Sequence, residues 1–103
     1  MVERKSSKRI SKDNEKKYIG DRVNGKKEGF GIMIYKNGDK YIGQWKEDNR
    51  EGYGIVYYSN GDKYEGEFVN DIQNGYGKYY YSNGNWFEGE IKEIKKMDME
   101  WNT

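Results

Sequence analysis

Cysteine and histidine are both absent from the 103 residues of the chain. Their absence excludes a zinc site of the usual kind, a thiolate nucleophile, a Ser-His pair and an imidazole base. The sequence also has no secretory signal, no N-glycosylation sequon and no apolar run long enough to span a membrane. These absences predict a cytoplasmic, non-enzymatic protein that holds neither a metal nor a cofactor.

Hydrophobic residues are also scarce, at 33% of the chain against 36% charged residues. Aromatic residues reach 17%, and because each ring buries a large area they can supply the missing core. All of them lie beyond residue 17. Residues 1–17 instead carry seven Lys or Arg against three Asp or Glu, so we interpret this segment as a flexible basic tail.

From residue 18 onward the sequence repeats with a period of 23 residues, giving units at 18–40, 41–63 and 64–86 and a fragment at 87–103. Each unit begins with an aromatic residue that has a glycine two positions later. Each full unit then contains a Gly-aromatic-Gly element and ends near an Asn-Gly pair, which between aromatic and β-branched runs is a strong hairpin signal. The pattern predicts an all-β fold in which successive hairpins form one elongated, single-layer antiparallel sheet.

The Asn-Gly turn leaves two registers open between the strands that it joins. A two-residue turn would place Trp45 opposite Phe30. A three-residue turn ending in Gly38 would place Trp45 opposite Gly29. We prefer the second register because it lets large rings lie over strand glycines, whose backbone is otherwise bare. The polar segment at 46–51 is interpreted as a looser loop between the two strands of a unit.

The leading aromatic residue with its glycine, the Gly-aromatic-Gly element and the closing Tyr-x-Asn-Gly at period 23 together resemble the MORN repeat. The resemblance implies a repeat domain over 18–91 and a module that binds or positions other proteins without catalysing a reaction. MORN-containing proteins occur at membrane junctions and in ciliary and cytoskeletal assemblies. The resemblance therefore also implies a protein associated with the cytoskeleton, a cilium or a membrane. The fold does not determine which partner is bound.

The fragment at 87–103 keeps the leading Phe87 and its glycine but loses the Gly-aromatic-Gly element. Ile94, Met97 and Trp101 then recur at helical spacing, although Met97, Met99 and Trp101 also alternate as they would in a strand. We interpret residues 92–103 as a C-terminal cap, with a short helix as the preferred form.

One face of the predicted sheet carries aromatic side chains spaced one repeat apart. They can pack on the glycines and on each other, or they can form a recognition surface, because a single-layer sheet has no second layer to cover them. The second interpretation predicts an adaptor or scaffold that binds an amphipathic helix or an extended peptide of a partner protein. The candidate partner-binding residues are Tyr35, Tyr41, Trp45, Tyr58, Tyr64, Phe68, Tyr81 and Phe87.

The basic tail supports an alternative function, a peripheral membrane protein that binds anionic phospholipid. A solvated tail without a function is the competing interpretation, because three acidic residues dilute its charge. Nucleic-acid binding is not predicted, whereas self-association through unpaired edge strands is compatible with an open sheet. The candidate contacts for an anionic surface are Arg4, Lys5, Lys8, Arg9, Lys12, Lys16 and Lys17.

Acidic side chains fall in the predicted polar loops and strands, and their spacing is not that of an EF-hand. Asp48, Glu51, Asp71 and Glu88 are therefore interpreted as parts of a solvated surface.

Overall fold

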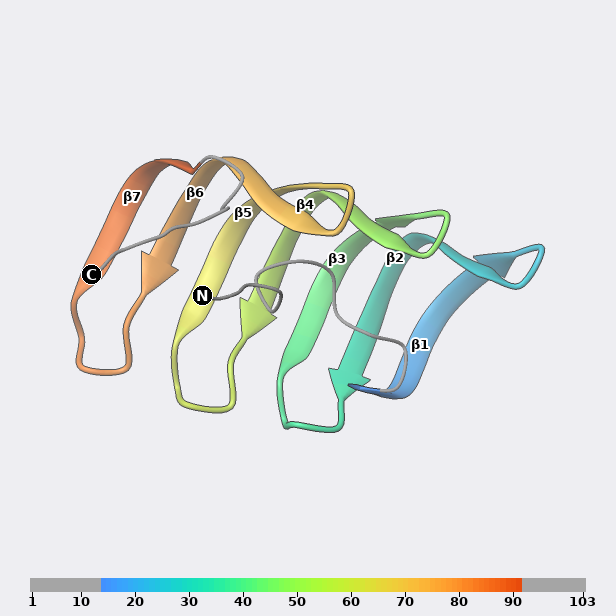
Figure 1. The fold of residues 1–103 in the computed structure, drawn as a ribbon, viewed down its shortest axis with the longest axis horizontal. Coiled ribbons are helices and arrows are strands. Elements are labelled where there is room, and N and C mark those ends of the chain that lie inside the picture. The colour runs from blue at the N-terminus through green and yellow to red at the C-terminus, as the bar shows by residue number, and fades with distance from the viewer. Residues whose placement is uncertain (1–13, 92–103) are drawn as a thin grey trace, which may run out of the picture.

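The computed structural model describes residues 14–91, which form one open sheet of seven antiparallel strands. The strands lie side by side in chain order, as Figure 1 shows. Their bounds are β1 Glu15–Val23, β2 Lys26–Tyr35, β3 Lys40–Lys46, β4 Asn49–Tyr57, β5 Lys63–Val69, β6 Ile72–Tyr80 and β7 Trp86–Ile91. The predicted all-β sheet of successive hairpins is confirmed.

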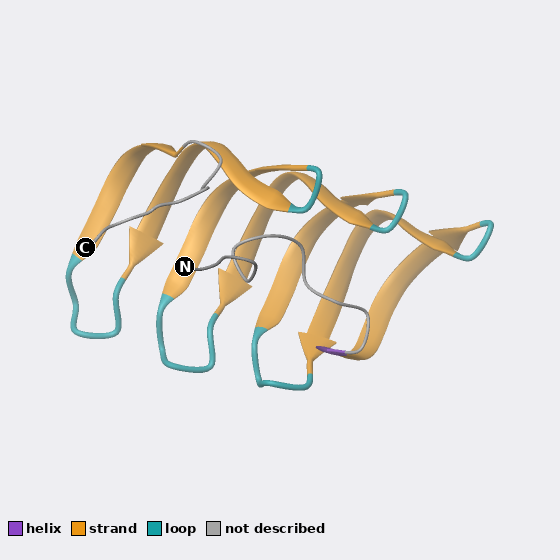
Figure 2. Cartoon of the chain, viewed as in Figure 1, coloured by secondary structure: helices purple, strands orange, loops and turns teal. Residues whose placement is uncertain are grey.

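Two kinds of turn alternate along the chain and lie at opposite ends of the strands (Figure 2). Within a unit the turn has two residues, both with positive φ, as in a type I′ turn. The predicted looser loop at 46–51 is therefore wrong, since β3 ends at Lys46 and β4 begins at Asn49. Asn and Asp adopt positive φ more readily than most residues do, and they fill four of these six positions. The three turns are Asn24-Gly25, Glu47-Asp48 and Asn70-Asp71.

The turn between units contains Asn-Gly and follows the register that we preferred. The amide of Tyr35 donates to the carbonyl of Asp39 at 3.0 Å, and the amide of Gly38 donates to the carbonyl of Tyr35 at 3.0 Å. Gly38 has a φ of 98°, which closes a three-residue loop without strain on a Cβ atom. Trp45 consequently lies opposite Gly29, as predicted.

Strand β1 begins earlier than the first repeat unit. Glu15, Lys16 and Lys17 lie in this strand, although the sequence analysis assigned them to the tail, and Glu15 pairs with Tyr35 of β2. The candidate contacts Arg4, Lys5, Lys8, Arg9 and Lys12, together with the predicted cap at 92–103, lie outside the described residues.

Packing is concentrated on one face of the sheet, which we call the inner face. The buried hydrophobic side chains there are Met33, Tyr35, Tyr41, Trp45, Val56, Tyr64 and Phe68. We call the opposite side the outer face. Phe30 and its neighbours Ile32, Ile34 and Ile42 alternate with the buried residues along β2 and β3 and lie on the outer face. The side chains of β2 and β3 are thus divided between a packed inner face and the outer face.

Candidate functional site

Glycine pairs in neighbouring strands receive the leading tyrosine of each unit. Gly43 lies opposite Gly54, and Gly66 lies opposite Gly77. A methyl group at Gly77 would lie 2.6 Å from Cε1 of Tyr64, which is closer than any real contact. The hydroxyl of Tyr64 donates to the carbonyl of Glu67 at 2.9 Å, so its polar end is satisfied as well. The ring therefore lies flat against backbone that only glycine can offer.

The inner-face rings also contact one another in a continuous series across the repeats. Tyr41 packs edge-on against Trp45 of its own unit at 5.0 Å between centroids, and against Phe68 of the next unit at 5.2 Å. Tyr18 meets Trp45 in the same way at 5.7 Å. Edge-to-face pairs at such distances are favourable beyond the area that they bury. Each unit thus covers the leading ring of the unit before it.

This packing decides how the candidate partner-binding residues are placed. Tyr41 and Tyr64 are 0% exposed, and burial raises the pKa of both hydroxyls. Tyr35, Trp45 and Phe68 are buried beside them, while Tyr58 is half-buried and stacks on Tyr79 at 5.8 Å. Phe87 and Tyr81, at the C-terminal end, are 49% and 47% exposed. Of the eight aromatic candidates, these two keep a large accessible surface.

Two buried cations lie among these rings and were not singled out from the sequence. Lys27 and Arg50 occupy the same position in successive units and are 1% and 6% exposed. Arg50 Nε donates to Oδ1 of Asp71 at 2.8 Å, and its NH2 group donates to the carbonyl of Asp71 at 2.7 Å. The guanidinium carbon also lies 4.9 Å from the centroid of Phe68, within cation–π range.

Lys27 is held by two carboxylates instead of one. Its Nζ lies 3.1 Å from Oε1 of Glu15 and 3.3 Å from Oδ1 of Asp48. It also lies 5.4 Å from the centroid of Trp45. The interpretation of Asp48 and Asp71 as solvated surface is therefore wrong, because each accepts hydrogen bonds from a buried cation of the preceding unit. A buried charge is stable only when it is paired in this way.

Burial by itself lowers the pKa of Arg50, but the carboxylate of Asp71 and the Tyr35 hydroxyl raise it, and the net pKa lies above its usual value. The guanidinium therefore stays charged. Arg50 with Asp71, and Lys27 with Asp48, consequently link neighbouring units.

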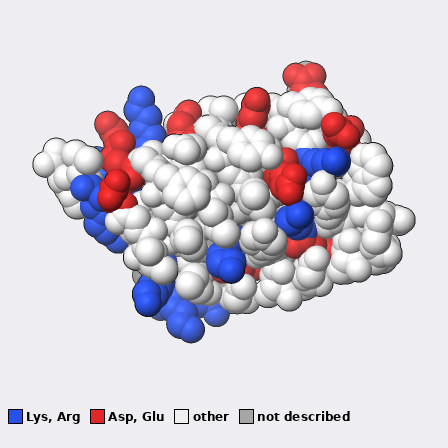
Figure 3. Space-filling view, turned by 180° about the vertical axis from the view of Figure 1, so that it is seen from behind, with Lys and Arg blue, Asp and Glu red and all other residues white. Residues whose placement is uncertain are grey.

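The outer face carries a row of side chains that changes character halfway along the sheet. Ile19, Ile32, Ile42 and Ile55 lie directly opposite one another in β1 to β4, and we call them the isoleucine row. In β5 to β7 the same row continues as Glu65, Lys78 and Glu88. Beside the row, Phe30 and Tyr53 are 58% and 57% exposed. The view from behind in Figure 3 shows uncharged residues over most of the surface, with charged groups scattered between them and gathered at the left edge and lower left of the view.

A second row on the outer face alternates lysines with aromatic rings, and we call it the lysine row. Lys63 Nζ lies 5.9 Å from the centroid of Tyr57 and 4.6 Å from that of Tyr80. Lys40 Nζ lies 5.6 Å from the centroid of Tyr57. The row ends at Trp86, which is opposite Tyr80 and exposed. Lys17, a sequence candidate for contact with an anionic surface, lies at its other end, opposite Ile34.

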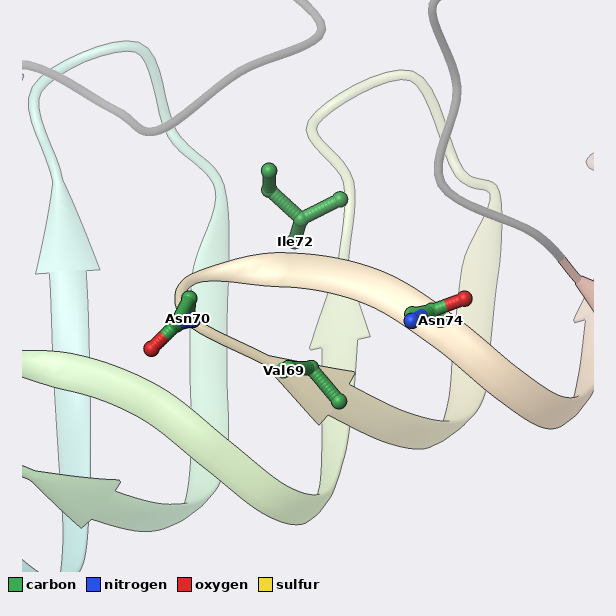
Figure 4. A pocket seen from close by; sticks show the side chains of 4 residues that line it. All are labelled: Val69, Asn70, Ile72 and Asn74. Carbon is green, nitrogen blue, oxygen red and sulfur yellow. The ribbon is translucent and has the colours of Figure 1, made fainter.

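A hollow of about 100 Å³ lies beside the turn between β5 and β6, lined by Val69, Asn70, Ile72 and Asn74 (Figure 4). It has room for only a few water molecules. Within residues 14–91 no group of three or more Asp or Glu side chains is placed to hold a metal ion. None of the helical structure in the described residues is long and apolar enough to cross a membrane.

An open sheet of near-identical hairpins, each covering the ring of the one before, defines a repeat protein. The model of the MORN repeat matches residues 18–40, 41–63 and 64–86, so the chain belongs to the MORN repeat family. MORN repeats are generally protein- or membrane-interaction modules, and the family is a non-catalytic one. A search among curated proteins finds no match for this chain.

Proposed function

We propose that the protein is a non-catalytic adaptor or scaffold that binds an amphipathic helix of a partner protein on the outer face of β1 to β4. The isoleucine row supports this proposal, because four branched apolar side chains lie in register with no charge between them. Contiguous apolar surface of this kind on a soluble domain usually marks an interaction site. The exposed rings of Phe30 and Tyr53 extend the same surface.

The spacing of the row favours a helix over an extended peptide. Neighbouring strands lie about 4.8 Å apart, so the row offers one isoleucine at each such step across the sheet. A helix laid along it rises about 5.4 Å per turn and presents one apolar side chain per turn on a given face. A peptide in extended conformation would alternate its side chains at a longer repeat of nearly 7 Å. The helix therefore matches the row over three turns.

The burial of the inner face shifts the predicted binding surface. Tyr41, Trp45, Tyr64 and Phe68 are buried, so among the eight candidate residues a partner can best reach the two exposed ones at the C-terminal end. Phe87 and Tyr81 remain part of the proposed interaction surface. Family membership supports a place in a cytoskeletal or ciliary assembly in the cytoplasm, and we include that location in the proposal.

The repeat itself supplies variants that test this proposal without damage to the fold. Ile42→Glu and Ile55→Lys introduce the residues that the next unit has at these positions, Glu65 and Lys78, which already form a cross-strand pair. We expect this double variant to melt cooperatively near the parent and to lose proteins that the parent retains in a cross-linked pulldown. The matched control is Glu65→Gln with Lys78→Gln, which should retain them. An unchanged set of retained proteins for the double variant would exclude the isoleucine row.

The lysine row supports a second candidate function, binding to anionic phospholipid. Lysines interleaved with tyrosine and tryptophan suit the interface of a membrane, where the rings lie at the headgroup level and the ammonium groups meet anionic lipid. In flotation assays, we expect binding to vesicles that contain phosphatidylserine but not to neutral ones, and weaker binding in high salt. Lys40→Gln with Lys63→Gln should reduce it, and so should deletion of residues 1–13, which leaves β1 whole. Equal binding to neutral vesicles would exclude this function.

A further inference from the structure

The two edges of the open sheet differ in how well they could accept another strand. Strand β1 has two shifts of register against β2 and carries the charged residues Lys16, Lys17, Asp21 and Arg22. Irregular backbone and charged side chains are the usual protection of an exposed edge. Strand β7 pairs with β6 in six consecutive register pairs without a shift. Within residues 14–91, no strand pairs with its other side.

The inner face is also incomplete at β7. Tyr41 and Tyr64 are covered because the following strand places a glycine beneath each ring and the following unit adds another apolar side chain. Phe87 is the equivalent residue of the last unit, and its ring lies over Gly89, where a Cβ atom would be 3.1 Å from Cζ of Phe87. No described strand supplies the second glycine. Phe87 is therefore 49% exposed where Tyr41 and Tyr64 are 0% exposed.

The sequence that follows β7 lacks the residue types that a further hairpin of this kind requires. At the repeat period, Ile94 takes the position of Asp48 and Asp71, which have φ values of 72° and 73°. A β-branched residue is strongly disfavoured at such an angle. Glu100 takes the position of Gly54 and Gly77, where any side chain would collide with the leading ring. Residues 92–103 therefore do not continue the repeat pattern that places a glycine beneath each leading ring.

We propose that β7 binds an extended, basic, glycine-containing segment of a partner protein as an eighth, antiparallel strand. The glycine lies opposite Gly89 and beneath the ring of Phe87, as Gly77 lies beneath Tyr64. The residues on either side of that glycine are Lys or Arg, because they face Glu88 and Glu90 on the outer face. The next residues outward are apolar and meet Phe87 and Ile91. Backbone hydrogen bonds along the strand supply affinity, and these side chains supply specificity.

Charge distinguishes this occupant from a second copy of the chain. Two β7 strands paired antiparallel with Gly89 opposite Gly89 would set Glu88 of each copy against Glu90 of the other. Like charges directly opposite one another destabilise a strand pair. A basic segment reverses the sign of both contacts, and opposite charges already meet within the repeat, where Glu65 lies opposite Lys78 and pairs with Lys63 at 3.0 Å. The partner segment is thus the better match to the edge.

The β7 edge would be a second binding surface beside the isoleucine row. This inference rests on the proposed protein-binding function, but it does not require that the isoleucine row binds a partner. It is tested with the full chain and three labelled, end-blocked heptapeptides. The first is Thr-Val-Lys-Gly-Lys-Val-Thr, the second has both lysines replaced by glutamate, and the third has the glycine replaced by valine. Fluorescence anisotropy measures binding, and the exposed Trp86 of β7 gives an independent signal. We expect the first peptide to bind at least about tenfold more tightly than either of the others.

Matched variants of the chain locate the site. Glu88→Gln with Glu90→Gln should weaken binding of the first peptide about tenfold. Glu65→Gln with Glu67→Gln, the same pair in the internal strand β5, should leave it unchanged. The outer-face variant Ile42→Glu with Ile55→Lys should bind the peptide as the parent does, so failure at one surface is separable from failure at the other.

Several results would overturn the proposal. One is equal affinity for the three peptides, and another is no binding by the full chain. Binding that appears only after removal of residues 92–103 would show that the chain's own continuation occupies the edge. A dimer in analytical ultracentrifugation that is abolished by Gly89→Val and not displaced by the peptide would assign the edge to a second copy.

Discussion

The outer face changes between the first four strands and the last three, and the inner face changes at the last strand, although all are built from the same repeat. On the inner face, the leading rings Tyr41 and Tyr64 are fully covered, whereas Phe87 is half exposed. On the outer face, the isoleucine row gives way to Glu65, Lys78 and Glu88. The backbone pairing is nearly the same throughout. The repeat thus fixes the backbone scaffold, while the side chains that vary from unit to unit determine the chemistry of the surface in each part of the sheet.

The exposure of Phe87 follows from the position of its unit at the end of the described sheet as well as from the sequence. A repeat protein is stabilised by contacts between neighbouring units, so a unit with one neighbour keeps an unfinished surface. The N-terminal end is closed by Glu15, which lies outside the repeat and pairs with Lys27. The C-terminal end has no comparable contact in residues 14–91. Within the described residues, β7 therefore keeps an unpaired edge and a half-exposed leading ring.

The largest expected effect contrasts two glycines that each lie beneath a leading ring, Gly54 in β4 and Gly89 in β7. Gly54→Ala places a methyl group inside the ring of the buried Tyr41, and we expect it to lower the free energy of unfolding by about 4 kcal/mol, because the ring must leave its site. Gly89→Ala meets only the exposed Phe87 at 3.1 Å and should cost about 1 kcal/mol. Urea unfolding measures both. Similar losses for the two variants would mean that the last unit is as tightly packed as the second.

A smaller effect is expected from the carboxylates that tie the units together. Asp71→Ala leaves the guanidinium of Arg50 buried without its carboxylate, and we expect a loss of about 3 kcal/mol in the free energy of unfolding. Asp48→Ala should cost less than half as much, because Lys27 keeps its contact with Glu15 at 3.1 Å. A double-mutant cycle of Asp71→Ala with Arg50→Met should show strong coupling. Additive losses would mean that the pair does not tie the two units.

Much of the fold could be predicted because it depends on local chemistry repeated in phase. The Asn-Gly pairs and the glycines beneath large rings fix the strand order and the register, and the position of Trp45 opposite Gly29 follows from them. The turn at Glu47-Asp48 could not be read in this way. Neither residue is a glycine, and both have positive φ. The turn is stabilised by hydrogen bonds that the amide and the Nζ of Lys27, in another unit, donate to Oδ1 of Asp48.

The interaction surface was harder to predict than the fold. A single-layer sheet predicts an exposed aromatic face, but Tyr41 contacts rings of two units at once. The alternation of apolar and polar residues along one strand does not predict such contacts between units. The buried cations look like ordinary surface charges in the sequence. The one feature of the sequence that could have identified them is their spacing. Lys27 and Arg50 recur at the same repeat position, and each lies 21 residues before an aspartate that accepts a hydrogen bond from it.

The smallest expected effect concerns alkaline pH and the tyrosine hydroxyls of the covered half. Burial, partly offset by Arg50, raises the pKa of Tyr35 to about 12, whereas in the unfolded chain a tyrosine titrates near about 10. Between these values the unfolded state loses a proton that the folded state keeps. This contribution to stability is therefore complete below about pH 10 and falls by about 1.4 kcal/mol per pH unit above it. Tyr35→Phe should reduce the slope of this decline by the same amount.

Urea unfolding at pH 9, 10 and 11 measures the slope. The variant Trp86→Phe with Trp101→Phe leaves Trp45, which is buried on the inner face, as the fluorescent probe. A parent and a Tyr35→Phe chain that lose stability in parallel would show that the Tyr35 hydroxyl ionises as readily in the folded sheet as in the unfolded chain, and the contrast between the covered and the open ends would then not extend to the titration of Tyr35.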